Sequence, residues 1–386
     1  MWSKIGHRSP NKEQLLIGRK SSKEVRANMK KSWSWWMCCP HVVQLQRRVV
    51  TTVFTVMVLA IVAPVVTAQS SLTFQGRVSG EFAANALAIH GDLLAVANGS
   101  TVHLVDVSRP DAAAIVGEHD FADSVLGLVM EGEFVFVANG HEGFQRLDVS
   151  SPSEPVVTGM SATRGQAVGV AVSGAHAFVA DNSIGFDVVR TTGEVTPVGE
   201  YLADGFPRGI GAAGDFVFLA DQPAGLIVID VTQPASPTPV GQLALSGARA
   251  RVIVPQVTTG SVAPPIVCVT AGAWSQVGGD VLFVEASRMS GSEGGSYLQV
   301  VDVSDPTAPV IAAPIPTSEQ PRGIVLHGEH AFLVSAGMLE IFDVSDPSQP
   351  TRTASQRVGS GANALAVNDE SVFVATDDGI SIFARP

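Results

Sequence analysis

The sequence predicts an all-β protein, a seven-bladed β-propeller of four-stranded blades. Three observations support this prediction. A motif recurs about every 41 residues, each repeat alternates apolar and polar residues between turns, and no segment after the amino-terminal region keeps a helical period. A period of this length is typical of propellers, in which four strands form one blade of roughly 40–50 residues.

The repeat is marked by an aspartate that closes an apolar run, as in GLIVIDVTQP. These aspartates are Asp106, Asp148, Asp230, Asp302 and Asp343, at intervals of 42, 82, 72 and 41 residues. The interval of 82 residues spans two repeats, with Arg190 at the middle position. The interval of 72 residues is one repeat with insertions, which we place at about 255–279 and 287–296.

Each repeat contains the pattern of four strands. In QAVGVAVSGAHAFVADNSIGFDVV two alternating strands flank a hairpin glycine, a polar turn and a third strand follow, and a Pro-rich turn leads to the fourth. The last repeat ends after its third strand at Ala384, whereas SLTFQGRVSG near residue 71 has the pattern of a fourth strand. We therefore expect the amino-terminal strand to complete the last blade, because a closed ring leaves fewer exposed edges.

The motifs GLIVIDVTQP, HLVDVSRP, LQVVDVSDP and EIFDVSDP, each after a strand pair like VSGAHAFVAD, resemble those of the LVIVD-repeat proteins. The resemblance covers Ser71 to Pro386. It implies a β-propeller in an exported or surface-associated protein, and it implies no particular reaction. Arg190 in the third repeat and the insertions in the fifth depart from the pattern, so we expect irregular blades there.

Charge divides the chain near residue 68. Residues 1–68 hold 11 of the 24 Lys and Arg residues and only Glu13 and Glu24, which leaves 13 basic residues, all Arg, against 34 acidic ones. We therefore predict two parts, a basic amino-terminal segment (1–68) and the propeller (71–386). So acidic a propeller argues against nucleic acid and anionic membranes as partners.

The apolar stretch 49–66 follows Arg47 and Arg48 and ends in the small-residue pattern VTA, as secretory signals do. We expect export with cleavage after Ala68, and a start at Met37 would give a signal of ordinary length. The alternative is an uncleaved anchor, since the stretch is just long enough to span a bilayer. Only Cys268 remains after the cleavage site, so no internal disulfide is expected in the mature chain. We expect a monomer.

Several motifs suggest a cofactor or metal, but each has a simpler interpretation. GIGAAG, from Gly209, resembles a dinucleotide-binding loop but lies within an expected strand and not before a helix. The histidines of HGEH, His327 and His330, are expected in a solvated hairpin and not as a metal pair. The acids of DVSDP are expected to stabilise turns through their own backbone amides. We therefore predict no cofactor, no metal and no catalytic residue.

One set of aligned positions indicates a binding site. The residue nine positions after the fourth-strand glycine opens each first strand, the strand that lines the channel of a propeller. These residues are Asn85, Leu126, Val168, Arg208, Ala250, Arg322 and Asn363, and Arg249 and Arg251 flank Ala250. The polar residues Asn98, Asn139, Asp181 and Asp221 follow the second strands and are expected on the same face.

The predicted binding residues are therefore Asn85, Arg208, Arg249, Arg251, Arg322 and Asn363. They would form a partly cationic pocket for an anionic or hydrogen-bonding ligand. The alternative is that the arginines only tie neighbouring blades together through Asp and Asn side chains. Two classes of function stay open: a non-catalytic module that binds a protein or glycan at the cell surface, and a hydrolase or lyase with its site at this mouth. The binding module is favoured, because an enzyme would place His, Asp or Glu at several of these positions.

Overall fold

The computed structural model describes residues 72–80, 82, 84–222, 224–244, 266–269, 281–287, 296–318, 321–346 and 348–386. All of them belong to the compact unit Thr67–Pro386. The second unit, Met1–Val66, which contains the expected signal or anchor segment, lies outside the described residues.

Six antiparallel four-stranded blades occur in the described part of the chain. Blade 1 contains β2 (Ala84–His90), β3 (Leu93–Asn98), β4 (Thr101–Asp106) and β5 (Ala114–Asp120), with a short 3-10 turn, η1 (Pro110–Ala112), before β5. Blade 2 contains β6 (Gly127–Glu131), β7 (Phe134–Ala138), β8 (Phe144–Asp148) and β9 (Val156–Ser161). Blade 3 contains β10 (Ala167–Ser173), β11 (His176–Asp181), β12 (Gly185–Arg190) and β13 (Thr196–Leu202).

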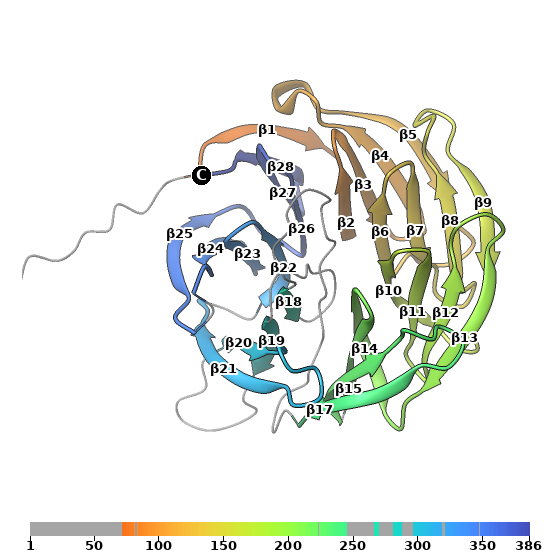
Figure 1. Ribbon diagram of the computed structural model, residues 1–386. Helices are drawn as coiled ribbons and strands as arrows, with labels where there is room; N and C mark the ends of the chain where they lie inside the picture. Colours follow the sequence, from red (N-terminus) through yellow and green to blue (C-terminus); the bar gives the residue numbers. More distant parts are fainter. Residues whose placement is uncertain are drawn as a thin grey trace, which may run out of the picture. The chain divides into compact units, whose positions relative to one another are not determined.

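Three further sets of strands continue the pattern along the chain. Blade 4 contains β14 (Phe206–Ala213), β15 (Phe216–Gln222), β16 (Gly225–Asp230) and β17 (Thr238–Leu243). The β22–β25 blade contains β22 (Pro321–His327), β23 (His330–Ser335), β24 (Met338–Asp343) and β25 (Thr351–Arg357). The closing blade contains β26 (Ala364–Val367), β27 (Ser371–Thr376), β28 (Gly379–Ala384) and β1 (Phe74–Ser79). In each blade the first strand lies on the inner side of the ring (Figure 1).

The closing blade joins the two ends of the propeller, as the sequence predicted. Strand β1 pairs antiparallel with β28, from Phe74 opposite Phe383 to Ser79 opposite Gly379. The amide of Ala384 donates a hydrogen bond to the carbonyl of Thr73 at 2.8 Å. The first strands complete the arrangement, because β2 packs beside both β6 and β26, and β22 packs beside both β18 and β26.

One sheet differs from the blades. It contains β18 (Ile266–Val269), β19 (Val281–Ser287), β20 (Ser296–Asp302) and β21 (Val310–Pro316), and its first pair, β18 and β19, is parallel. Strand β18 lies inside the stretch that the sequence analysis assigned to an insertion (255–279). A parallel pair needs a crossover connection of about a dozen residues, and the insertion supplies one.

The apolar core lies between neighbouring blades, because successive residues of a strand face opposite sides of the sheet. In β3, Leu94 and Val96 pack toward the closing blade, while Ala95 and Ala97 pack toward blade 2. The same alternation recurs around the ring, so each interface between described blades is filled by two faces of aliphatic side chains.

The fourth-strand glycines are required by contact with the next blade. The carbonyl oxygen of Pro152, in the turn after β8, occupies the space that a β-carbon at Gly117 of β5 would need. The same Gly–Pro contact joins Gly76 to Pro110 and Gly199 to Pro234. In blade 3, where Arg190 replaces the aspartate, the side chain of Val195 takes this place against Gly159. Blade 3 is nevertheless a regular four-stranded sheet, so the expectation of an irregular third blade was wrong.

The aspartates that mark the repeat stabilise turns, as expected. Asp230 accepts a hydrogen bond from the amide of Thr232 at 2.8 Å, and Asp343 accepts one from the amide of Ser345 at 2.9 Å. For Asp230 the Thr232 backbone amide, followed by the Thr232 hydroxyl, holds the pKa below its usual value. The GIGAAG motif lies within β14, a strand, so the dinucleotide-binding interpretation remains rejected.

Candidate functional site

The aligned first-strand positions are β-bulges. In β2 the register shifts between Ala84 and Ala86, so Asn85 is an extra residue opposite β3. Equivalent shifts occur around Val168 in β10, Arg208 in β14 and Arg322 in β22. A bulge leaves one residue outside the ladder and redirects its side chain. The sequence alignment had therefore found a real structural position, although it could not show that the position is a bulge.

These bulges lie at one end of the blades, which we call the bulge face. At this end the residue before each bulge pairs with the last residues of the second strand, for example Pro207 with Asp221. The second-strand residues singled out in the sequence, Asn98, Asn139, Asp181 and Asp221, therefore lie on the bulge face, as expected.

Two of the predicted binding residues contact each other. The Arg322 guanidinium donates a hydrogen bond to Oδ1 of Asn363 at 2.6 Å, and this bond joins the β22–β25 blade to the closing blade. Asn85 donates from Nδ2 to the carbonyl of Val125 at 3.4 Å, which joins blade 1 to blade 2. These contacts match the alternative in which the residues tie blades together.

Arg208 behaves differently from Arg322. Its side chain is exposed, and among the described residues it has neither a hydrogen bond nor an ion pair. The other two predicted binding residues, Arg249 and Arg251, lie outside the described residues. The structure therefore brings Arg322 and Asn363 together, and it leaves the Arg208 guanidinium available at the bulge face.

A second set of polar groups lies buried beside the bulges. Asn139 is fully buried, and both polar atoms of its side chain lack a hydrogen-bond partner within the described part of the chain. The Oγ of Ser335 and the Oδ2 of Asp221 are in the same condition. Buried polar groups without protein partners commonly bind ordered water or a ligand. Asn139, Asp221 and Ser335 therefore add unused hydrogen-bonding capacity to the bulge face.

Burial raises the pKa of the Asp221 carboxyl. Backbone hydrogen bonds from Ala224 and Gly205 act in the opposite direction, and the nearby charge of Asp204 adds to the increase. A carboxyl in such an environment holds its proton to higher pH than an exposed one does.

A cluster of charges near the outer end of blade 3 was not predicted from the sequence. Asp181, Asp187 and Glu200 line a small cleft with Arg164. Arg164 forms an ion pair with Glu200 at 2.5 Å. Burial, followed by the charges of Asp181 and Glu200, raises the pKa of Asp187 to about 6. Only Asp181 had been singled out, because the other residues share no motif.

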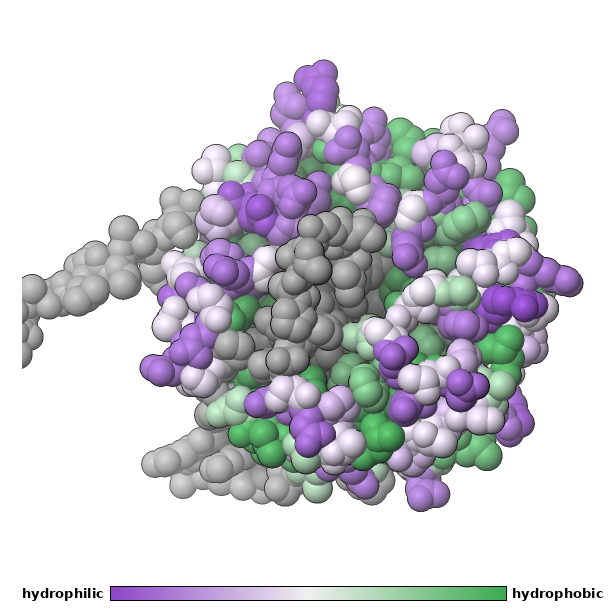
Figure 2. Space-filling model, in the orientation of Figure 1, coloured by the Kyte–Doolittle hydropathy of each residue, from purple (hydrophilic) through white to green (hydrophobic). Residues whose placement is uncertain are grey.

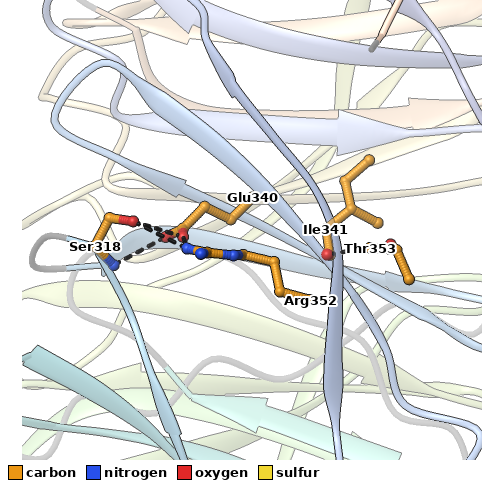
Figure 3. Close-up of polar contacts among 5 residues, drawn as sticks. All are labelled: Ser318, Glu340, Ile341, Arg352 and Thr353. Carbon is orange, nitrogen blue, oxygen red and sulfur yellow. Dashed lines mark hydrogen bonds and ion pairs between the residues drawn. The ribbon is translucent and has the colours of Figure 1, made fainter. Parts of the chain in front are cut away.

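The sequence analysis also missed a buried ion pair in the β22–β25 blade. Glu340 of β24 is fully buried, and Figure 3 shows its carboxylate between Arg352 and Ser318. Arg352 donates to Oε1 at 2.7 Å, and the Ser318 hydroxyl donates to the same oxygen at 2.8 Å. The Ser318 amide donates to Oε2 at 3.2 Å. The alternation of β24 around Glu340 was the only sequence signal, since it places this acid on an inward face.

The hairpin histidines also differ from their predicted environment. His327 is buried, with 9% of its surface exposed, because the turn of the closing blade covers it. Its Nε2 lies 2.9 Å from Oδ1 of Asp369, and burial lowers its pKa. The prediction of a solvated hairpin was therefore wrong for His327. Among the residues described, no group of three or more His, Cys, Asp or Glu side chains is arranged to hold a metal.

The described surface is mainly polar, with scattered apolar side chains. Hydrophilic residues predominate around the described rim of the face seen in Figure 2, and separate apolar patches lie between them. The most exposed apolar residues are Met160, Val156, Leu202, Phe206, Val310 and Phe74. Searched over the described residues, the chain has no helix that could cross a membrane.

Comparison with known families agrees with this geometry. The LVIVD repeat model matches residues 124–163, 164–189, 204–244, 293–315 and 320–355. The chain belongs to the LVIVD-repeat family. The matched segments coincide with blades 2 to 4, with β20 and most of β21, and with most of the β22–β25 blade. No curated protein matches this LVIVD-repeat chain.

Solved structures share the fold of this LVIVD-repeat protein. The β-propeller domain of Myceliophteria thermophila Cps50 (Swd1) has a TM-score of 0.61 at 11% identity, over 82% of this chain and 100% of that domain. A chain of the Mitotic Checkpoint Complex has a TM-score of 0.57 at 11% identity, over 81% and 90%. The computationally designed Ika8 protein has 0.56 at 10%, over 81% and 100%. At such identities the likeness shows a common fold alone.

Proposed function

We propose that this protein is an exported, non-catalytic binding module of the cell surface, which binds an anionic or hydroxyl-rich ligand, on a glycan or a protein, at the bulge face. The carrying observation is the set of bulges that presents Asn85, Arg208 and Arg322 at the same end of three different blades. Arg208 supplies an unpaired cation, and the buried Asn139 supplies unused donors and acceptors nearby. Guanidinium and amide groups in such an arrangement suit carboxylate and hydroxyl ligands.

The proposed module is a ring of seven blades, with the β18–β21 sheet as the fifth. In support, Gly241 of β17 meets the carbonyl of Pro306 in the turn after β20, which is the contact that joins successive blades elsewhere. Strands β20 and β21 also pair antiparallel with the register shift that the third and fourth strands of the other blades share. The β18–β21 sheet therefore follows blade 4 as a blade would.

Export is proposed from the amino-terminal sequence. The apolar stretch 49–66 and the residues before Gln69 have the pattern of a cleaved signal, and an uncleaved anchor is the alternative. Amino-terminal sequencing of exported protein should find Gln69 as the first residue. Recovery of membrane-bound protein that retains residues 49–66 would instead favour the anchor.

A binding screen tests the proposed module. The purified protein is applied to an array of acidic and neutral glycans and of surface proteins, beside an Arg208→Ala/Arg322→Ala variant. We expect binding by the parent chain and its loss in the double variant, with each charged contact worth about 1.5–3 kcal/mol. Arg109→Ala, which changes an exposed arginine of the turn before β5, is the matched control. A double variant that folds and binds every ligand as the parent does would reject the site.

A channel-site hydrolase or lyase is the second candidate, and Asp221 is the observation that favours it. This buried carboxyl has a raised pKa and lies opposite the residue that precedes Arg208, so an acid and a cation share one mouth. A general acid needs a carboxyl that retains its proton near neutral pH. Turnover of a glycan substrate that disappears in Asp221→Asn, while ligand binding persists, would favour the enzyme.

A further inference from the structure

We propose that blade 4 carries a subsite for a carboxylated sugar residue, a uronate, formed by Phe206 and Arg208. This inference rests on the proposed function and names the ligand class for one part of the bulge face. Both residues belong to the first turn of the ladder in β14, on either side of Pro207. Pro207 is buried, whereas Phe206 and Arg208 are both exposed.

Phe206 is an exposed aromatic ring at a channel mouth. It is 55% exposed, and among the described aromatic residues only Phe74 is comparable, at 53%. Phe74 packs edge-on against Phe383 of the closing blade at 5.8 Å, whereas Phe206 has no ring partner in the described part of the chain. An exposed ring without a partner offers a flat apolar surface, and the C–H face of a pyranose can pack on such a surface.

Arg208 keeps its charge available. The carboxyl nearest along the ladder is Asp221, opposite Pro207, and it is fully buried with its hydrogen bonds directed to the amides of Ala224 and Gly205. Arg322 at the equivalent bulge is already bonded to Asn363. The cation with no described partner therefore lies beside the exposed ring in blade 4 and in no other described bulge.

The spacing of the pair fits one ring and one carboxylate. Residues two apart along a strand are separated by about 7 Å. A pyranose stacked on Phe206 would direct its carboxylate toward Arg208, whose fork of N–H groups matches both carboxylate oxygens. A neutral sugar would use only the ring, and a peptide carboxyl terminus would use only the cation. The combination therefore favours a uronate over both.

Calorimetric titration with three probes tests the subsite. The probes are tetragalacturonate, its methyl ester and a short peptide with a free carboxyl terminus. We expect the parent to bind the acid at least tenfold more tightly than the ester or the peptide. Arg208→Gln should weaken the acid about tenfold and leave the ester unchanged, whereas Phe206→Ala should weaken both sugars. Arg357→Gln, an exposed arginine at the end of the outer strand β25, is the control and should change nothing.

The outcomes separate this subsite from the wider proposal. Equal binding of acid and ester would overturn the uronate, and so would unchanged affinities in both folded variants. If tetragalacturonate binding is lost in Asn85→Ala/Arg322→Ala but kept in Phe206→Ala and Arg208→Gln, the mouth remains a site and the blade 4 subsite is rejected. Tighter binding of the peptide, lost in Arg208→Gln, would replace the uronate with a peptide carboxylate. An absence of binding by any probe, together with a blank array, would reject both proposals.

Discussion

The carbonyl oxygen of Pro152 lies where a β-carbon of Gly117 would have to be, and the two residues belong to neighbouring blades. The contact links two features of the repeat that the sequence shows separately, the glycine of the fourth strand and the proline of the turn before it. Because the proline of one repeat meets the glycine of the preceding repeat, each blade is positioned against its neighbour by backbone atoms as well as by apolar packing.

Replacing Gly117 with Ala should destabilise the propeller. The added methyl group would overlap the backbone of residues 152 and 153, which cannot move as a side chain can, so we expect a loss of about 2 kcal/mol or more in the free energy of unfolding. Urea denaturation measures it. Gly169→Ala is the matched control, because a β-carbon there meets Ile210 and Ala180 only at 3.6 and 3.9 Å. Equal stability of the two variants would contradict the role of the contact.

Deleting residues 71–80 should open the ring. This removes β1, leaves the edge of β28 unpaired and exposes Ile380 and Ile382, which are fully buried. We expect a strong loss of thermal stability and of solubility, measured by calorimetry and by sedimentation. A chain that begins at Ser71 serves as the control and should behave as the longer chain does. An unchanged melting temperature after the deletion would refute the shared blade.

Breaking the buried ion pair of the β22–β25 blade should be costly. Glu340→Ala would leave the Arg352 guanidinium and the Ser318 hydroxyl without their acceptor, and we expect about 3 kcal/mol of destabilisation. Arg109→Ala removes an exposed ion pair with Asp111 and should cost almost nothing. Chemical denaturation compares the two. If Glu340→Ala were as stable as Arg109→Ala, the Glu340 pair would be of no consequence for the fold.

Asp187 should make stability fall as the pH rises. Its pKa is raised to about 6, above the ordinary value of 3.8, so the folded protein holds this proton more tightly than the unfolded chain does. The contribution is complete below about pH 4 and is lost as the pH passes through 6. Asp187→Asn should therefore raise the melting temperature relative to the parent at pH 7.5 and change the difference little between pH 3 and 4. A constant difference across this whole range would contradict the shift.

Local sequence was sufficient for the strands, the turns and the closing blade. Alternating residues define each strand, and an aspartate such as Asp230 bonds an amide two residues on, so its role depends on its immediate neighbours. The missing fourth strand after Ala384 and the spare strand near residue 71 indicated closure, because a four-stranded blade needs both. The alignment of Arg208 with Arg322 likewise followed from the repeat alone.

The tertiary structure alone decided what those aligned residues do. Arg322 is bonded to Asn363 and Arg208 is not, although the two share the context PRG, because their partners come from neighbouring blades about one repeat away. His327 is buried, against expectation, because Asp369 of the next blade covers it. A repeat sequence specifies the blade it encodes. The environment between blades depends on the side chains that two different repeats bring together, and it exists only when the ring has closed.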